Sequence, residues 1–369
     1  MIEDPETAIL SRLVARRPQD AILLGQIVDA ALLSGQLPVA AHFAERYAAL
    51  TRSSPWHPFP NHPVAPIERP AAEQYLTTSK IRHDIAQLGH LRGLGLIGAE
   101  FDPVIAAYER TLETYQEIGE MERVPLDSVA EELVRTHHGR ILHIRPTPRL
   151  AGAALSSSWD RQAAEQSYLD HPLGILVIDD FLCPEALESL RNFCLESTIW
   201  FSHRFAQDRV GTLFRDGFNT PLLLQIAEEI QSAFPRVIGR KHHLDQMWAY
   251  RYRHNHRKSV PHADFAAVNV NFWIGPNEAN LDPESGGLVI YEMEAPKDWT
   301  FEDYNRNGKK IREFITANKP KTIEIPYREN RALIFNSDLF HMTADCRFRE
   351  GFDAARTNVT MLYGKRNAP

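Results

Sequence analysis

Cysteine is scarce in this sequence and long apolar runs are missing. The three cysteines, Cys183, Cys194 and Cys346, are scattered and none belongs to a C-x-x-C pair, so neither a disulfide framework nor a cysteine-ligated zinc site is expected. No apolar run approaches the roughly 18 residues that a membrane-spanning helix needs. The first residues also lack the basic segment and apolar stretch of a secretory signal. We therefore expect a cytoplasmic protein that does not bind membranes.

An excess of positive charge is missing too. The formal net charge is -7, which excludes a protein whose whole surface is built for nucleic acid. Hydrophobic residues at 43% and charged residues at 24% are typical of globular proteins and exclude global disorder. Because 369 residues exceed the roughly 250–300 at which one core stops growing, more than one domain is expected.

The N-terminal half reads as helical. Residues 1–52 form a predicted helical hairpin region with Gly35 at a turn, weakly similar to a tetratricopeptide repeat. Two interpretations stay open for it: an ordinary hairpin that supports the rest of the chain, or a module that binds a protein partner. Residues 53–72 are a proline-rich linker. Residues 73–170 form a helical and irregular connection, with helices expected over 79–93 and 103–120.

Residues 171–369 change period and read mainly as strands. Short strand-like segments occupy 174–178, 246–253, the surroundings of His262, 267–274, 287–291, 321–325, 331–335, 340–348 and 357–364. Helices are expected over 184–198, 222–234 and 309–318. Short strands separated by turn signals are typical of sandwiches, barrels and jelly rolls. We predict an α+β protein whose all-α N-terminal region precedes a C-terminal jelly roll with flanking helices.

Two H-x-D triplets offer metal ligands, His243-Leu244-Asp245 and His262-Ala263-Asp264. The triplet alone does not choose between them, because histidine and aspartate are common enough for chance matches. In an extended segment, residues two apart point to one face, so His262 and Asp264 would converge on one point. His341 follows a later apolar strand and supplies a third ligand. Two imidazoles and one carboxylate on one face are typical of non-haem Fe(II) oxygenases.

A cation near the last strand completes the constellation. Arg356 opens the alternating segment 356–363, where an inward guanidinium would be a costly buried charge unless an anion meets it. A carboxylate, bound bidentately, is the natural partner. A dicarboxylate co-substrate is therefore the simplest explanation. Arg349 is the alternative cation.

On these residues, the stretch from about 174 to 365 resembles the Fe(II)/2-oxoglutarate-dependent dioxygenases, and within them the prolyl-hydroxylase-like branch. The resemblance implies that His262, Asp264 and His341 bind Fe(II) and that Arg356 binds the far carboxylate of 2-oxoglutarate. It also implies co-substrate contacts from Thr360, four residues after the arginine, and from Tyr252 before the first ligand. The turn into the strand at Ser285-Gly286-Gly287-Leu288 is similar as well.

Two features depart from the family pattern. The interval from His341 to Arg356 is longer than usual, which is why Arg349 stays open. Trp273 stands where some members place a carboxylate-binding tyrosine. Asn269, Asn271 and Trp273 share one strand face, so one of the two amides, with Asn271 as the preferred residue, would take that role or Trp273 would shape the pocket.

The resemblance implies a hydroxylase that uses Fe(II), 2-oxoglutarate and dioxygen and releases succinate and CO2. Its acceptor stays open among amino acids, peptides, protein side chains and small metabolites. The alternative is an interaction protein whose jelly roll is passive or binds a metal without redox chemistry. The long excursion between Tyr291 and Lys321 suggests a substrate lid.

Overall fold

The computed structural model describes residues 5–52, 74–117, 122–203, 209–252, 254–256 and 259–366. The predicted linker, residues 53–72, lies outside this part of the chain. The chain divides into two compact units. The first holds Met1–Pro148, Ser189–Leu223 and Trp248–Arg251, and the second holds Arg149–Glu188, Leu224–Met247 and Tyr252–Pro369.

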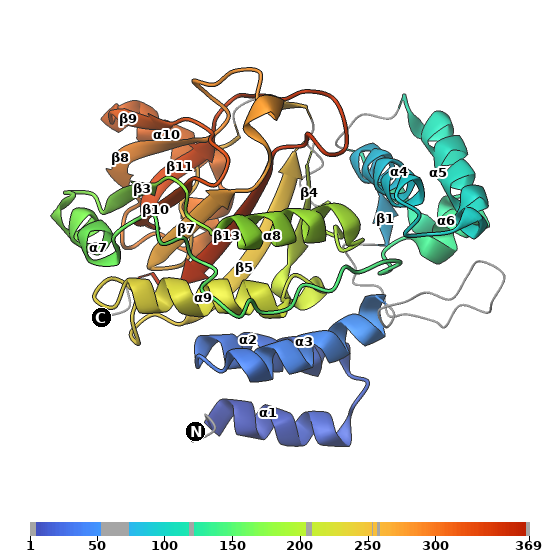
Figure 1. The fold of residues 1–369 in the computed structure, drawn as a ribbon, viewed down its shortest axis with the longest axis horizontal. Coiled ribbons are helices and arrows are strands. Elements are labelled where there is room, and N and C mark those ends of the chain that lie inside the picture. Colours follow the sequence, from blue (N-terminus) through green and yellow to red (C-terminus); the bar gives the residue numbers. More distant parts are fainter. Residues whose placement is uncertain are drawn as a thin grey trace. The chain divides into compact units, whose positions relative to one another are not determined.

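Six helices dominate the first unit. They are α1 (Pro5–Arg16), α2 (Ala21–Leu33), α3 (Leu37–Arg52), α4 (Thr78–Gly93), α5 (Asp102–Tyr115) and α6 (Glu132–His137). Asp20 and Thr77 cap α2 and α4 by accepting the backbone N–H three residues on, as short polar side chains do at helix starts. Helix α2 contacts both α1 and α3 (Figure 1), and Gly35 turns the chain between α2 and α3 at a φ of 71°.

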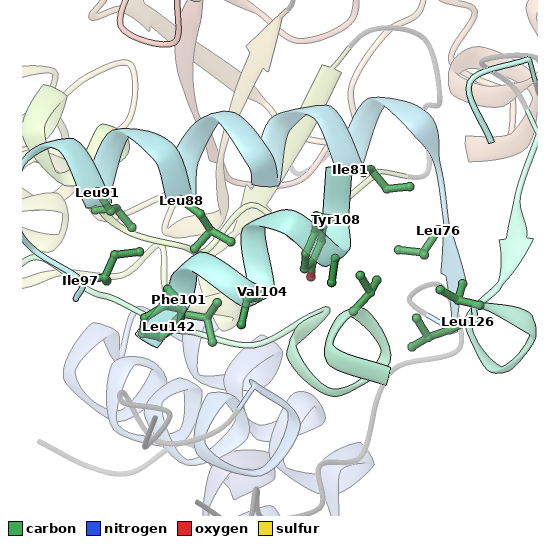
Figure 2. Close-up of a cluster of buried hydrophobic side chains, with 13 residues drawn as sticks. Leu76, Ile81, Leu88, Leu91, Ile97, Phe101, Val104, Tyr108, Leu126 and Leu142 are labelled. Carbon is green, nitrogen blue, oxygen red and sulfur yellow. The ribbon is translucent and has the colours of Figure 1, made fainter. Parts of the chain in front are cut away.

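A compact apolar cluster holds α4 and α5 together. Leu88 and Leu91 of α4 face Val104 and Tyr108 of α5, with Leu126 and Leu142 closing the cluster (Figure 2). Two very short strands, β1 (Tyr75–Leu76) and β2 (Val124–Pro125), pair beside it. The sequence does not predict this pair, because a strand of two residues is too short to show an alternating pattern.

The first unit also buries charges that are paired with each other. Arg52, at the end of α3, donates to Asp216 at 2.9 Å and stacks on Phe201 at 4.2 Å. Asp216 ends a 3-10 turn, Phe214–Asp216, that follows β4 (Arg209–Leu213). Lys80 of α4 pairs with Asp84 one turn on. These ion pairs are contained within the unit and need no ligand.

The second unit contains two antiparallel sheets (Figure 1). In the larger sheet, β3 (Ile175–Ile178), β10 (Ala332–Asn336), β7 (Val268–Trp273) and β13 (Thr357–Tyr363) follow one another in that order, with β5 (Leu244–Tyr252) next. The smaller sheet has the order β11 (Leu339–Thr343), β8 (Leu288–Glu294) and β9 (Thr322–Ile325). A further pair joins β12 (Cys346–Arg347) to β6 (Asn255–His256). The helices α7 (Arg161–Asp170) and α10 (Gly308–Asn318) belong to this unit, and α8 (Pro184–Glu196) and α9 (Pro221–Ala233) each have residues in both units.

The two faces of β7 and β13 differ in chemistry. On one face, Phe272 packs near Phe181, and the Tyr363 hydroxyl donates to the carbonyl of Ala227 in α9. On the other face the register sets Thr360 opposite Asn271, and both side chains are polar and buried. Strand alternation therefore turns an apolar face toward α9 and a polar face away from it.

The turn into β8 requires glycine. Gly286 has a φ of 84°, which side chains rarely tolerate. A Cβ on Gly287 would lie 1.9 Å from the carbonyl oxygen of Ile325, so no other residue fits against β9 there. This turn brings two backbone carbonyls to the position that the site uses.

The structure is a mixed fold of helices and sheets, and most predicted strands match observed ones within two residues at each end. In the described ranges, no helix combines the length and apolar character needed to cross a membrane. Besides β1 and β2, the elements α6, α7, β4 and β6 were not predicted. Only Glu165 is buried in α7, so the helix has no apolar stripe that a sequence pattern could reveal.

Candidate metal and co-substrate site

Three predicted metal ligands converge in the second unit. His262 and His341 form an antiparallel bridge, with N–H to O distances of 3.0 and 2.8 Å. One ligand atom from each of His262, Asp264 and His341 lies within 4.8 Å of the others. The Nε2 atoms of His262 and His341 lie 4.0 and 3.4 Å from carboxylate oxygens of Asp264. This donor set and spacing fit a divalent metal ion.

The backbone sets the orientation of both imidazoles. Nδ1 of His262 lies 3.1 Å from the carbonyl of Val260, and Nδ1 of His341 lies 3.0 Å from that of Leu339. A carbonyl only accepts, so each Nδ1 carries a proton and each Nε2 is the nitrogen left to face Asp264. Nε2 is therefore the atom of each ring that would bind a metal.

Asp264 is the most constrained ligand. Its side chain is 8% exposed, against 34% for His262. Burial acts to raise the pKa of Asp264, but His341, His262 and the amide of Asn269 outweigh it and lower the pKa below its ordinary value. The Asn269 amide donates to Oδ2 of Asp264 at 2.6 Å. The carboxylate is therefore held ionised and in one orientation.

The excursion between β8 and β9 supports the turn that carries these ligands. The N–H of Ala263, between His262 and Asp264, donates to the carbonyl of Tyr304, and the Asn305 amide donates to the carbonyl of Ala263 at 2.8 Å. Tyr304 and Asn305 belong to a π-helical turn, Glu302–Arg306. An apolar cluster of Ala263, Ala295, Tyr304, Ile311 and Phe340 fixes α10 beside it. In this structure the excursion packs against the ligand turn as a buttress, and its role as a substrate lid stays a prediction.

Arg356 is buried, with 1% of its surface exposed. Its Nε and one terminal nitrogen donate to the carbonyls of Gly286 and Gly287 at 2.6 and 3.3 Å, and the other terminal nitrogen donates to Asn358 at 3.1 Å. In the part of the chain that the structure describes, no carboxylate pairs with it. Of the five N–H groups of a guanidinium, these bonds leave one on each terminal nitrogen. Both terminal nitrogens therefore keep an N–H that can bind an anion.

Aromatic rings enclose Arg356. Its guanidinium carbon lies 4.6 Å from the ring centre of Tyr252 and 5.8 Å from that of Trp273. The indole N–H of Trp273 is buried and has no hydrogen-bond partner among the described residues. A buried donor of this kind is uncommon, because leaving it unsatisfied costs roughly 1–3 kcal/mol. A ligand oxygen would satisfy it.

The other predicted co-substrate residues lie on the same polar face. The Thr360 hydroxyl donates to the side-chain carbonyl of Asn271 at 2.6 Å. Tyr252 lies with its hydroxyl 3.2 Å from that of Thr343. The structure thus brings together the eight residues predicted for the site, listed here: Tyr252, His262, Asp264, Asn271, Trp273, His341, Arg356 and Thr360.

The two alternatives from the sequence lie elsewhere. Among the residues that the structure describes, the only metal-competent group is the one around Asp264, and it does not include His243 or Asp245. Arg349 is half exposed and lies 3.5 Å from Asp353 on the same surface segment. Neither the triplet at 243 nor Arg349 therefore has the surroundings of a buried site.

Three residues of the site were not assigned a role from the sequence: Asn269, Asn358 and Asn305. Asn269 and Asn358 each precede a second polar residue by two positions in an otherwise apolar strand, and this polar alternation is a signal that could have been read. Asn305 lies in the excursion, where no period points to it.

Comparison with known proteins gives distant structural likeness only. No family model matches the chain, and no curated protein matches it either. One similar structure is the non-heme alpha ketoglutarate dependent carbocyclase SnoK from nogalamycin biosynthesis, 12% identical, with 58% of this chain and 87% of that chain covered and a TM-score of 0.40. Another is HygX from Streptomyces hygroscopicus with nickel and 2-oxoglutarate bound, which is 13% identical, with 55% of this chain and 87% of that chain covered and a TM-score of 0.38. A third is a Pseudomonas putida prolyl-4-hydroxylase, which is 11% identical, with 56% of this chain and 100% of that chain covered and a TM-score of 0.36. Likeness at this level leaves function to be inferred from the side chains themselves.

Proposed function

We propose that this protein is an Fe(II)- and 2-oxoglutarate-dependent dioxygenase that hydroxylates a C–H bond. One observation carries the proposal: two imidazoles and a carboxylate converge within 4.8 Å, and a series of hydrogen bonds connects that carboxylate to a buried arginine that no carboxylate neutralises among the described residues. A passive jelly roll or a metal site without a co-substrate would leave the charge of Arg356 unexplained.

In this proposal, His262, Asp264 and His341 hold Fe(II), and Arg356 grips the far carboxylate of 2-oxoglutarate. The proposed residues around that carboxylate are Thr360, Tyr252, Asn271 and Trp273. The indole N–H of Trp273 is a third donor beside the two terminal nitrogens of the guanidinium. When bound, Fe(II) supplies the redox chemistry that couples the decarboxylation of 2-oxoglutarate by dioxygen, giving succinate and CO2, to the insertion of oxygen into a substrate C–H bond.

The chain's own residues orient and shield the reactants. The backbone carbonyls of Val260 and Leu339 hold both imidazoles with Nε2 toward the metal position. Asp264 and His341 are almost wholly buried and His262 is one-third exposed, so the substrate is proposed to approach from the side of His262. The proposed acceptor is an amino acid, a peptide, a protein side chain or a small metabolite.

The finer structural predictions belong to this proposal. They are a double-stranded β-helix over residues 171–369, an all-α region before it that includes the weakly tetratricopeptide-like residues 1–52, and a cytoplasmic location. The residues around His262, Arg356 and the Gly286–Gly287 turn support membership of the prolyl-hydroxylase-like branch.

Spectroscopy under argon tests the proposal directly. Wild-type protein mixed with Fe(II) and 2-oxoglutarate should show the weak visible band of a metal-bound 2-oxo acid, and His262→Ala should abolish it. His243→Ala, the matched change in the other H-x-D triplet, should retain the band. A wild type without the band, or a His262→Ala variant that keeps it, would refute the proposed function.

A further inference from the structure

Four buried polar side chains form a continuous hydrogen-bonded row, here called the polar ladder: Asn358, Thr360, Asn271 and Asn269. None is more than 7% exposed. Asn358 donates to the Thr360 hydroxyl at 3.3 Å, Thr360 donates to Asn271 at 2.6 Å, and Asn271 donates to Asn269. The ladder crosses from β13 to β7 where Thr360 and Asn271 are register partners.

Each end of the polar ladder is hydrogen-bonded to a charged group of the site. Arg356 donates to Asn358 at 3.1 Å, and Asn269 donates to Asp264 at 2.6 Å. A guanidinium only donates and a carboxylate only accepts. The ends therefore dictate the direction of every link between them, and each amide has only one orientation that completes the row. Hydrogen bonds that all point one way polarise one another and strengthen the row.

Burying four polar side chains in a row costs more free energy than burying apolar ones would. Neighbouring positions on the same strands hold Val270, Val359 and Met361, which bury well without any hydrogen bond. Each ladder member satisfies the next, so removing one leaves a neighbour unsatisfied at a cost of roughly 1–3 kcal/mol. Packing alone does not call for these side chains, whereas holding Asp264 and Arg356 in register does.

We infer that Asn269 is a positioning residue for the metal ligand Asp264 and that the polar ladder extends this role to Thr360. The inference rests on the proposed function, since it presumes a metal at Asp264. Asn269 occupies one direction at Oδ2 and so restricts the rotation of the carboxylate. Partners of this kind behind a ligand commonly change metal affinity by about 10- to 100-fold when removed.

The test measures binding of Co(II) alone, without 2-oxoglutarate, to the full-length chain by its visible absorption. Asn269→Ala should bind Co(II) about 10- to 100-fold more weakly than wild type and should shift the absorption spectrum, because the carboxylate is free to turn. Thr360→Val, which keeps side-chain volume and lies three hydrogen bonds from Asp264, should weaken binding by about 3- to 10-fold, a smaller loss of the same kind.

Thr357→Val is the matched control. Thr357 is buried on the same strand, its hydroxyl donates to the carbonyl of Ala355 at 3.1 Å, and strand alternation places it on the other face from the polar ladder. Its variant should keep wild-type affinity and spectrum, and thermal melting checks that each variant is folded. If Asn269→Ala is unfolded, the Co(II) affinities of Thr360→Val and Thr357→Val are compared instead, and this comparison decides whether the inference holds.

The outcomes separate the two proposals. Wild type that binds Co(II), with both ladder variants weakened and Thr357→Val unchanged, supports the inference. Wild-type affinity and spectrum in a folded Asn269→Ala overturn the inference and leave the proposed function standing, as does equal behaviour of Thr360→Val and Thr357→Val. Wild type that takes up no Co(II) overturns both.

Discussion

Arg52 in the first unit and Arg356 in the second are equally buried, each 1% exposed, and each stacks on an aromatic ring. Arg52 has a carboxylate partner in Asp216 at 2.9 Å. Within the described ranges, the hydrogen-bond partners of Arg356 are carbonyls and an amide, with no carboxylate among them. A buried charge that is neutralised inside the protein serves the fold, whereas one that is hydrogen-bonded but not neutralised indicates a place for an anion from outside.

The largest effect should come from the metal ligands. His341→Ala removes one of three ligands, and 2-oxoglutarate turnover, measured as succinate release, should fall at least about 100-fold. His243→Ala changes a histidine outside the ligand group and should stay within about twofold of wild type, which is within ordinary variation for a surface change. Comparable losses in both variants would contradict the assignment of the site.

Exchanging the two buried arginines for methionine sharpens the comparison. Arg52→Met leaves Asp216 as a buried unpaired charge, so the free energy of unfolding in urea should fall by about 3–5 kcal/mol. Arg356→Met leaves no carboxylate unpaired but removes the donor from two carbonyls and the Asn358 amide oxygen, so that free energy should fall less, by about 1–3 kcal/mol.

The affinity for 2-oxoglutarate should depend on Arg356 and not on Arg52, the opposite of the order expected for stability. Calorimetry on the Mn(II)-loaded protein should show 2-oxoglutarate binding weakened about 100-fold by Arg356→Met, as expected for a lost bidentate charge contact worth about 2–3 kcal/mol. Folded Arg52→Met should retain the affinity. If both arginines affected only stability, the difference drawn between them would be wrong.

A smaller effect is expected from acid, through two buried histidines of the first unit. Burial lowers the pKa of His83 to about 4 and that of His203 to about 3, so the folded protein binds fewer protons there than the unfolded chain. Stability is then complete above the ordinary histidine pKa of about 6.5 and falls as the pH drops toward 4, by roughly 1 kcal/mol per pH unit for each histidine.

Urea unfolding of the full chain between pH 7 and pH 5 measures this slope. His83→Gln or His203→Gln should remove part of it and the double variant most of it. Asp84, whose pKa is lowered to about 2 despite its burial because Lys80 and His83 lie beside it, stays ionised throughout and does not contribute. An unchanged slope in the double variant would show that other groups titrate.

The smallest effect concerns Arg349 and the buttress. Arg349→Ala removes an exposed cation and should change 2-oxoglutarate affinity less than about twofold. Asn305→Ala removes one hydrogen bond to the turn between His262 and Asp264, worth about 1 kcal/mol, and should weaken Co(II) binding about fivefold. If Arg349→Ala weakened Co(II) binding as much as Asn305→Ala does, Asn305 would have no specific role in supporting the ligand turn.

The sequence was informative where period and residue type coincide. The alternation around Val268–Trp273 and Thr357–Tyr363 predicted two central strands that the structure contains. The joint occurrence of His262, Asp264 and His341 predicted a cluster that the structure brings together. Their roles stay proposals until metal binding is measured.

Features that depend on tertiary register could not be read from the sequence. The polar ladder exists because Thr360 faces Asn271 across two strands, and strand pairing does not follow from either strand alone. Asn305 reaches Ala263 through a π-helical turn that has no sequence period. Strand β4 was missed because Arg209–Leu213 is short and contains a glycine.

The imidazole contacts have a practical consequence for handling the protein. Because Val260 and Leu339 hold the rings through carbonyls only two positions upstream, ring orientation depends on local chain geometry rather than on any ion. A chelator such as EDTA should therefore remove the metal without changing the orientation of the two rings. Fresh ferrous salt should then rebind on mixing, with no slow conformational step.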